Sequence, residues 1–104
     1  MAEQPTISTH LLDAQSGQPA AGIPVRLTNL DRDEQVGQAI TDGDGRIRRL
    51  LEGPLTVGRY RLTVSLNGAF FEEVAITFVV DDSSRSWHVP LLLAPYSLTT
   101  YRGS

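Results

Sequence analysis

Apolar and polar residues alternate with a period of two along most of the chain, and the spacing of amphipathic helices is nearly absent. The alternation comes in short runs separated by Gly, Pro, Asn and Asp, which is typical of a β-sandwich or barrel. The pattern therefore predicts an all-β chain of eight strands. Their expected ranges are 6–13, 23–30, 36–41, 46–50, 58–66, 72–80, 86–93 and 97–102.

The clearest alternation lies in the segment 60–66, where the even positions are large and apolar and the odd positions are polar. Because successive side chains of a strand point to opposite faces, we expect one face of this strand to be core. The segments 74–80 and 25–28 follow the same rule. Two such sheets facing each other about 10 Å apart would bury both apolar faces and leave the polar faces to water.

The first and seventh predicted strands break this rule, because apolar residues occupy both of their faces. The outward sets are Ser8, His10 and Leu12 in the first strand, and His88, Pro90 and Leu92 in the seventh. Apolar residues on both sides of a strand indicate that both sides are covered. In a chain this short, a second subunit is the simplest cover, so we expect a symmetric oligomer.

Length, charge and cysteine content narrow the class of protein. A chain of 104 residues is expected to form a single domain, 1–104. Nine Lys and Arg against twelve Asp and Glu give a net charge of -3, which argues against nucleic-acid and membrane-surface partners. No cysteine is present for disulfides, thiolate metal sites or thiol nucleophiles. No leader or apolar span stands out, so we expect a cytoplasmic protein.

The candidate chemistry lies with the two histidines, His10 and His88. A single histidine on a strand is more often structural than catalytic, but both imidazoles here fall on outward faces, in a chain that also carries Arg46 and the terminal segment 101–104. A neutral imidazole can accept a proton near neutral pH, because its ordinary pKa is about 6.5. Arginine supplies permanent charge and paired donors for an anionic or carbonyl-rich substrate. A hydrolytic site is therefore conceivable.

Other familiar sites are not indicated. The run Asp42-Gly43-Asp44-Gly45 is similar to the opening of a calcium loop, but the acidic residue that would complete the loop is missing, so we interpret it as a turn. Two histidines without a carboxylate at ligand spacing do not make a zinc site. No nucleophile elbow, phosphate loop or dinucleotide fingerprint is present. We expect neither a metal nor a cofactor.

The C-terminal segment 88–104 closely resembles the end of the 5-hydroxyisourate hydrolases, the transthyretin-related proteins. The terminal Tyr101-Arg102-Gly103-Ser104 is the most specific mark of this resemblance. The segments 7–13, 22–25, 41–46 and 58–60 extend it over essentially the whole chain.

The resemblance implies a transthyretin-like (prealbumin-like) sandwich that assembles as a homotetramer, a dimer of dimers, with sites in a channel between dimers. It implies hydrolysis of 5-hydroxyisourate, a small molecule of urate degradation, to 2-oxo-4-hydroxy-4-carboxy-5-ureidoimidazoline without a cofactor. The implied catalytic residues are His10, Arg46, His88 and Ser104, and the implied substrate-binding residues are Tyr101, Arg102 and Gly103. Which histidine acts as general base stays open at this point.

The sequence departs from the family pattern at three places, one of which is Glu72 or Glu73, where the family tends to carry proline after its aromatic pair. The short helix that usually follows the fifth strand is expected to be missing, because Asn67-Gly68-Ala69 leads almost directly into the next strand. Leu98 stands where the family commonly has tyrosine, and could alter packing at the channel. The alternative to an enzyme is a non-catalytic prealbumin-like binding or structural module, which would have no use for the two histidines or the terminal segment; a small-molecule carrier is a further alternative.

Overall fold

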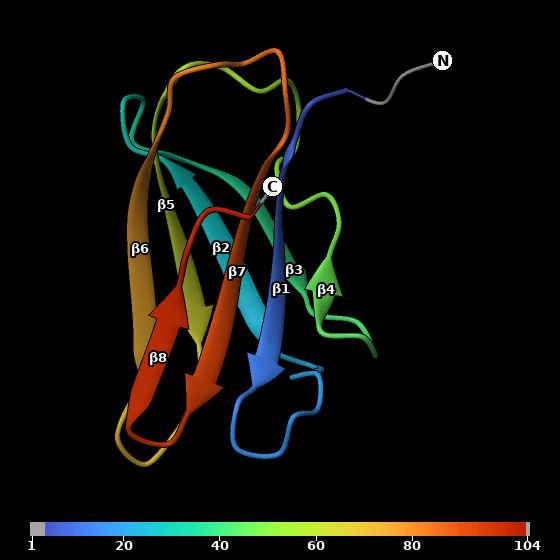
Figure 1. Cartoon of the computed structure of the whole chain (residues 1–104). Helices are drawn as coiled ribbons and strands as arrows, with labels where there is room; N and C mark the ends of the chain where they lie inside the picture. Colours follow the sequence, from blue (N-terminus) through green and yellow to red (C-terminus); the bar gives the residue numbers. More distant parts are fainter. Residues whose placement is uncertain (1–3, 104) are drawn as a thin grey trace.

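Eight strands form two four-stranded sheets that face each other across a common core (Figure 1). The computed structural model describes residues 4–103. The strands are β1 (Ile7–Asp13), β2 (Pro24–Asn29), β3 (Glu34–Ile40), β4 (Arg46–Ile47), β5 (Gly58–Ser65), β6 (Glu73–Val80), β7 (Trp87–Ala94) and β8 (Ser97–Thr100). No helix occurs within residues 4–103, and hence none long enough to cross a membrane. The all-β prediction and the missing helix are confirmed.

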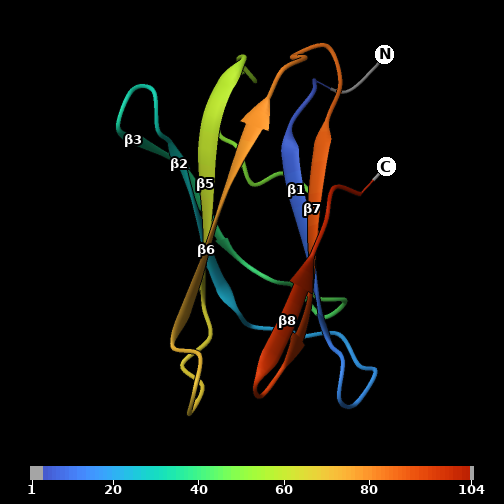
Figure 2. The same cartoon turned by 60° about the vertical axis from the view of Figure 1, so that its left-hand side comes forward.

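One sheet has the order β4-β1-β7-β8 and the other the order β3-β2-β5-β6. The two layers are seen nearly edge-on in Figure 2. All neighbouring strands are antiparallel except β1 and β7, which run parallel from the pair Ile7 and Trp87 to the pair Asp13 and Leu93. This parallel pair joins the two ends of the chain at the centre of one sheet. It is also the pair that carries both histidines.

The core lies between the sheets and follows the predicted alternation. Tyr60, Leu62 and Val64 on β5 are almost completely buried, and Val80 on β6 is buried with them. On the opposite sheet, Ile7, Thr9 and Leu11 of β1 and Trp87, Val89 and Leu91 of β7 point inward and are buried. Each large apolar side chain buried in this way contributes about 1.5–3 kcal/mol to folding.

Strand β4 is shorter than predicted. It ends at Ile47 instead of residue 50, yet Leu50 and Leu51 are buried in the core. The backbone of Leu50 donates to the carbonyl of Ile7, and the Leu50 carbonyl lies so close to Gly37 that a Cβ there would collide with it. The segment after β4 therefore crosses the core irregularly, since buried apolar side chains and isolated backbone hydrogen bonds hold it in place of a continuous strand ladder.

Strand β8 is also shorter than predicted, because it ends at Thr100 and not at residue 102. After β8 the chain crosses toward the upper half of β7 (Figure 1). There the backbone N–H of Gly103 donates to the carbonyl of His88 at 2.8 Å. A separate difference concerns β3, which begins at Glu34, two residues before its predicted start. Because β8 ends at Thr100, the chain can turn back across the sheet, and Gly103 then lies beside the predicted site residue His88.

Candidate active site

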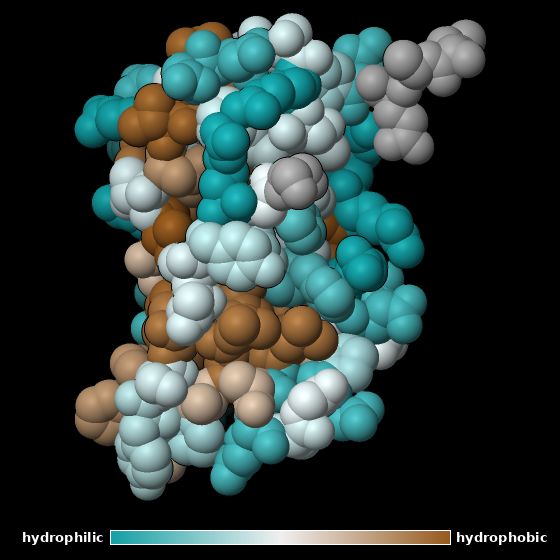
Figure 3. Space-filling view, in the orientation of Figure 1, coloured by the Kyte–Doolittle hydropathy of each residue, from teal (hydrophilic) through white to brown (hydrophobic). Residues whose placement is uncertain are grey.

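The outward side of the sheet β4-β1-β7-β8 is here called the outer face. It is defined by Ser8, His10 and Leu12 on β1, by His88, Pro90 and Leu92 on β7, and by Arg46 on β4. Figure 3 views this side, and shows hydrophobic surface across the lower part of β1 and β7 with more polar surface above and beside it. The outer face thus has a polar region next to an apolar one.

Three residues predicted for catalysis meet on the outer face. His10 and Arg46 are direct partners in the antiparallel pair β1 and β4. Ser8 is the direct partner of His88 in the parallel pair β1 and β7, so the two histidines are diagonal neighbours. Residues diagonal across a strand pair lie within reach of long side chains. The fold therefore brings Arg46, 36 positions away in the sequence, and His88, 78 positions away, close to His10.

The His88 imidazole is half-buried and held from two sides. Its Nδ1 lies 2.8 Å from the hydroxyl oxygen of Ser8. The Cα of Gly103 packs against the ring, since a Cβ at that position would lie 2.5 Å from His88 Cδ2. Burial lowers the pKa of His88 below its usual value, and the nearby positive charges of His10 and Arg46 lower it further. His88 is therefore held as a neutral imidazole, the form that accepts protons.

His10 makes a hydrogen bond that identifies which of its nitrogens carries hydrogen. Its Nε2 lies 2.9 Å from the backbone carbonyl oxygen of Asp44. A carbonyl oxygen only accepts, so Nε2 is the donor and carries the hydrogen. In the neutral ring the lone pair is then on Nδ1. His10 is thus oriented by backbone of the loop that precedes Arg46.

That loop, residues 42–45, owes its shape to Asp42. The Asp42 carboxylate accepts from the backbone N–H of Asp44 and of Arg46, each at 2.9 Å, and the N–H of Gly45 donates to the Asp42 carbonyl. The N–H of Arg46 is the main reason that the pKa of Asp42 lies below its usual range. The turn interpretation is confirmed. The turn sets both the Asp44 carbonyl against His10 and Arg46 beside β1.

The model of the HIUase/Transthyretin family matches residues 7–103. The chain belongs to that family. A 5-hydroxyisourate hydrolase of Caulobacter vibrioides is 38% identical, with 94% of this chain and 97% of that protein covered.

Solved structures of the HIUase/Transthyretin family also match. The structure of Klebsiella pneumoniae 5-hydroxyisourate hydrolase has a TM-score of 0.84 at 36% identity, covering 95% of this chain and 99% of that one. Sea bream transthyretin in complex with thyroxine has a TM-score of 0.80 at 24% identity, covering 93% of each chain. The latter likeness shows the shared fold, so the predicted transthyretin-like sandwich is confirmed.

The terminal family motif is divided between two sides of the sheet. Gly103 joins the histidine cluster, whereas the Arg102 guanidinium lies 5.5 Å from the centre of the Trp87 ring, which faces the core. Arg85 lies over the same ring at 4.8 Å. Tyr101 is exposed. Substrate contact by Tyr101 and Arg102 stays a prediction, and Ser104 lies outside the described residues.

The close approach of Gly103 to His88 gives a testable prediction. Gly103→Ala should turn the imidazole or detach the tail, because the added Cβ would overlap the ring. We expect the hydrolytic rate proposed below to fall about tenfold or more, as misplacement of a reacting group does. The free energy of unfolding should change by less than about 0.5 kcal/mol, since Gly103 packs against His88 on the outer face and not within the core between the sheets. Gly43→Ala, where a Cβ meets open space, is the matched control.

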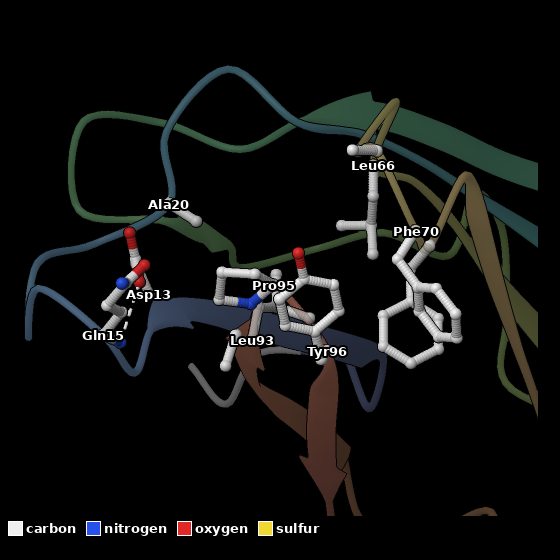
Figure 4. A pocket seen from close by; sticks show the side chains of 12 residues that line it. Asp13, Gln15, Ala20, Leu66, Phe70, Leu93, Pro95 and Tyr96 are labelled. Carbon is white, nitrogen blue, oxygen red and sulfur yellow. Dashed lines mark hydrogen bonds between the residues drawn. The ribbon is translucent and has the colours of Figure 1, made fainter.

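Two cavities of this protein lie away from the histidine cluster. A cavity of about 330 Å³ at the far end of the sandwich is lined by Leu66, Phe70 and Tyr96 among others (Figure 4). None of the candidate residues that the structure describes lines it. A groove of about 280 Å³ between β6 and β8 includes Tyr101 and Arg102. Residues 4–103 also contain no cluster of three or more His, Asp or Glu suited to a metal ion.

Two groups in the site were missed by the sequence reasoning. Ser8 contacts His88, and the Asp44 carbonyl contacts His10. The available signal for Ser8 was its position two residues before His10, on the same outward face. The signal for Asp44 was its place in the turn directly before Arg46. The parallel register of β1 and β7, which places Ser8 opposite His88, is not visible in the sequence.

Proposed function

We propose that this protein hydrolyses 5-hydroxyisourate, opening its six-membered ring to give 2-oxo-4-hydroxy-4-carboxy-5-ureidoimidazoline. The observation that carries the proposal is the cluster of two imidazoles and one guanidinium, His10, His88 and Arg46, on one face of a sheet. The relatives named as 5-hydroxyisourate hydrolases, which match along almost their whole length, support it. The cluster offers the acid–base and charge-stabilising groups that such a hydrolysis needs.

The chemistry requires a proton acceptor for water and a stabiliser for the developing oxyanion. We assign the acceptor to Nε2 of His88, because Nδ1 already faces Ser8 and the ring is kept neutral. The water oxygen forms a bond to the ring carbonyl carbon as its proton passes to His88. The carbon–nitrogen bond of the ring then breaks, and the departing nitrogen takes a proton back from the imidazolium.

Arg46 and His10 fit the remaining roles. The positively charged Arg46 guanidinium can stabilise the negative charge that grows on the carbonyl oxygen. His10 is fixed by the Asp44 carbonyl and can orient the substrate through its other ring nitrogen. Hydrolysis by these groups uses water and needs no cofactor. A role for Ser104 is part of the same proposal.

We further propose that the outer face is covered by another copy of the chain in a homotetramer. Leu12 and Leu92 on this face are only half-buried in the single chain, next to the histidine cluster. A partner copy would bury these leucines and close the cluster into a channel. Light scattering is expected to give four times the 11.4 kDa of one chain. The cytoplasmic location and the single-domain organisation stay predictions.

The proposal is tested by producing 5-hydroxyisourate from urate with a uricase and following its absorbance. The protein should speed the decay, and His10→Ala and Arg46→Ala should each slow it by about 10- to 100-fold because they remove an oriented or charged partner. Removal of residues 102–104 should act in the same direction. Arg61→Ala, on the outward side of the other sheet, is the control for a lost arginine. An unchanged decay rate with folded protein would reject the enzyme and favour the non-catalytic module.

A further inference from the structure

Ser8 is placed to fix the orientation and tautomer of the His88 imidazole. Its neighbours Ile7 and Thr9 are buried in the core, so the backbone that carries Ser8 is held by the sheet. The side chain projects to the outer face directly opposite His88 in the β1 and β7 pair. The hydroxyl oxygen then lies 2.8 Å from Nδ1 of the imidazole. This contact joins residues 80 positions apart in the chain.

The hydrogen bond can be drawn in two ways, because a hydroxyl both donates and accepts. If Ser8 donated to Nδ1, a neutral His88 would carry its hydrogen on Nε2 and could not take a proton there. If Ser8 accepts from Nδ1–H, the lone pair is on Nε2. The accepting arrangement also survives protonation unchanged, since both nitrogens of an imidazolium carry hydrogen. Only the accepting arrangement suits a proton acceptor at Nε2.

We infer that Ser8 is a positioning residue whose hydroxyl oxygen accepts a hydrogen bond from Nδ1–H of His88, fixing the ring tautomer that leaves the Nε2 lone pair free for the attacking water. The choice of this tautomer and its role in catalysis both rest on the proposed function, but the tautomer can be measured independently of any activity. The arrangement complements that of His10, whose Nε2–H donates to the Asp44 carbonyl. The two histidines are thereby held in opposite tautomers, each by a partner on the same face.

The tautomers can be measured directly, because the chain contains only two histidines. Long-range ¹H–¹⁵N correlation spectra of the ¹⁵N-labelled full chain, recorded where both rings are neutral, distinguish Nδ1–H from Nε2–H. We expect Nδ1–H for His88 and Nε2–H for His10, with assignment from His10→Asn and His88→Asn. Ser8→Ala should convert the His88 signals to a tautomer mixture and leave the His10 signals unchanged. Ser8→Thr, which keeps the hydroxyl, should restore the single tautomer.

The same variants have a kinetic expectation. Ser8→Ala should lower kcat for 5-hydroxyisourate hydrolysis about 10- to 100-fold with little change in KM, because it acts on the proton acceptor and not on binding. Ser8→Thr should recover most of the rate. Ser97→Ala, an exposed serine on β8 of the same sheet, should change neither readout.

The outcomes separate the two proposals. An Nε2–H tautomer for His88 in the unaltered protein, or unchanged His88 signals in Ser8→Ala, would overturn the inference. A loss of rate that Ser8→Thr fails to recover would also count against it. If the spectra agree but the unaltered protein leaves the decay of 5-hydroxyisourate unchanged, the positioning of His88 by Ser8 stands and the proposed function fails.

Discussion

Replacing His88 with alanine is expected to lower the rate of 5-hydroxyisourate hydrolysis by about 10²- to 10⁴-fold, the usual worth of a positioned general base. The side chain is held by Ser8 and Gly103 but belongs to neither core nor ladder, so the fold should tolerate its loss. The uricase-coupled decay assay measures the rate, and circular dichroism checks the fold. A folded His88→Ala protein with the full rate would assign the proton acceptor elsewhere.

The pH profile of the unaltered enzyme gives a second readout of the same residue. Because the neutral imidazole is the active form, kcat/KM should fall as pH drops through the pKa of His88. Burial, with the charges of His10 and Arg46, places that pKa below the ordinary value of about 6.5, so the acid limb should lie below pH 6.5. These two side chains come from β1 and β4, and β8 on the other side of β7 carries no titratable residue.

The variants then shift the limb in a defined direction. Arg46→Ala removes a positive charge and His10→Ala removes an imidazole whose protonated form opposes protonation of His88, so each should move the acid limb to higher pH. The limb should stay below pH 6.5 in both, because burial is the larger cause of the lowered pKa. If the acid limb of kcat/KM stays at the same pH in both variants, the group that titrates is not His88 in this cluster.

Gly45→Ala is expected to damage stability and activity together. Gly45 has a φ of 76°, in the left-handed region, and an added Cβ would collide with the carbonyl oxygen of Leu11 and approach the nitrogen of Ala20 to 3.2 Å. Strain and overpacking should lower the free energy of unfolding by about 3 kcal/mol. The flanking Asp44 carbonyl and Arg46 would shift with the turn, so the hydrolytic rate of the remaining folded protein should also fall.

A second glycine separates strain from collision. Gly17 has the same φ of 76°, but a Cβ there meets nothing within 4 Å. Gly17→Ala should therefore cost about 1 kcal/mol, from backbone strain alone, and leave the rate intact. Denaturant unfolding of both variants gives the difference. Equal losses of stability for Gly45→Ala and Gly17→Ala would remove the contact with Leu11 from the explanation.

The strands were predictable because each follows local rules. The alternation in 60–66 requires only that one face of a strand be apolar, and the structure buries Tyr60, Leu62 and Val64 accordingly. The turn at 42–45 was also predictable, since Asp and Gly tolerate the conformations that a tight turn needs. Arg46 directly follows that turn, but its pairing with His10, 36 residues earlier in the chain, joins distant segments and is not visible in the local pattern.

The rest depends on contacts between distant segments. That Ser8 lies opposite His88 depends on a parallel pairing whose register no local pattern encodes. The segment after Ile47 looks like a strand because its leucines are apolar, yet these leucines fill the core with only isolated backbone hydrogen bonds and no continuous strand ladder. The position of Arg102 over Trp87 follows from where the tail crosses the sheet, which only the assembled sandwich determines.

The pairing of the first strand with the seventh has a consequence for biosynthesis. Contacts across 80 residues close late, because the loop entropy for joining them is lost before any packing rewards it. During translation β2, β3, β5 and β6 can form their own sheet while β1 still lacks its central neighbour. A nascent chain still short of β7 would display an unpaired hydrogen-bonding edge of β1 to the cell, and its chemistry would begin only once β7 and the segment after it have emerged.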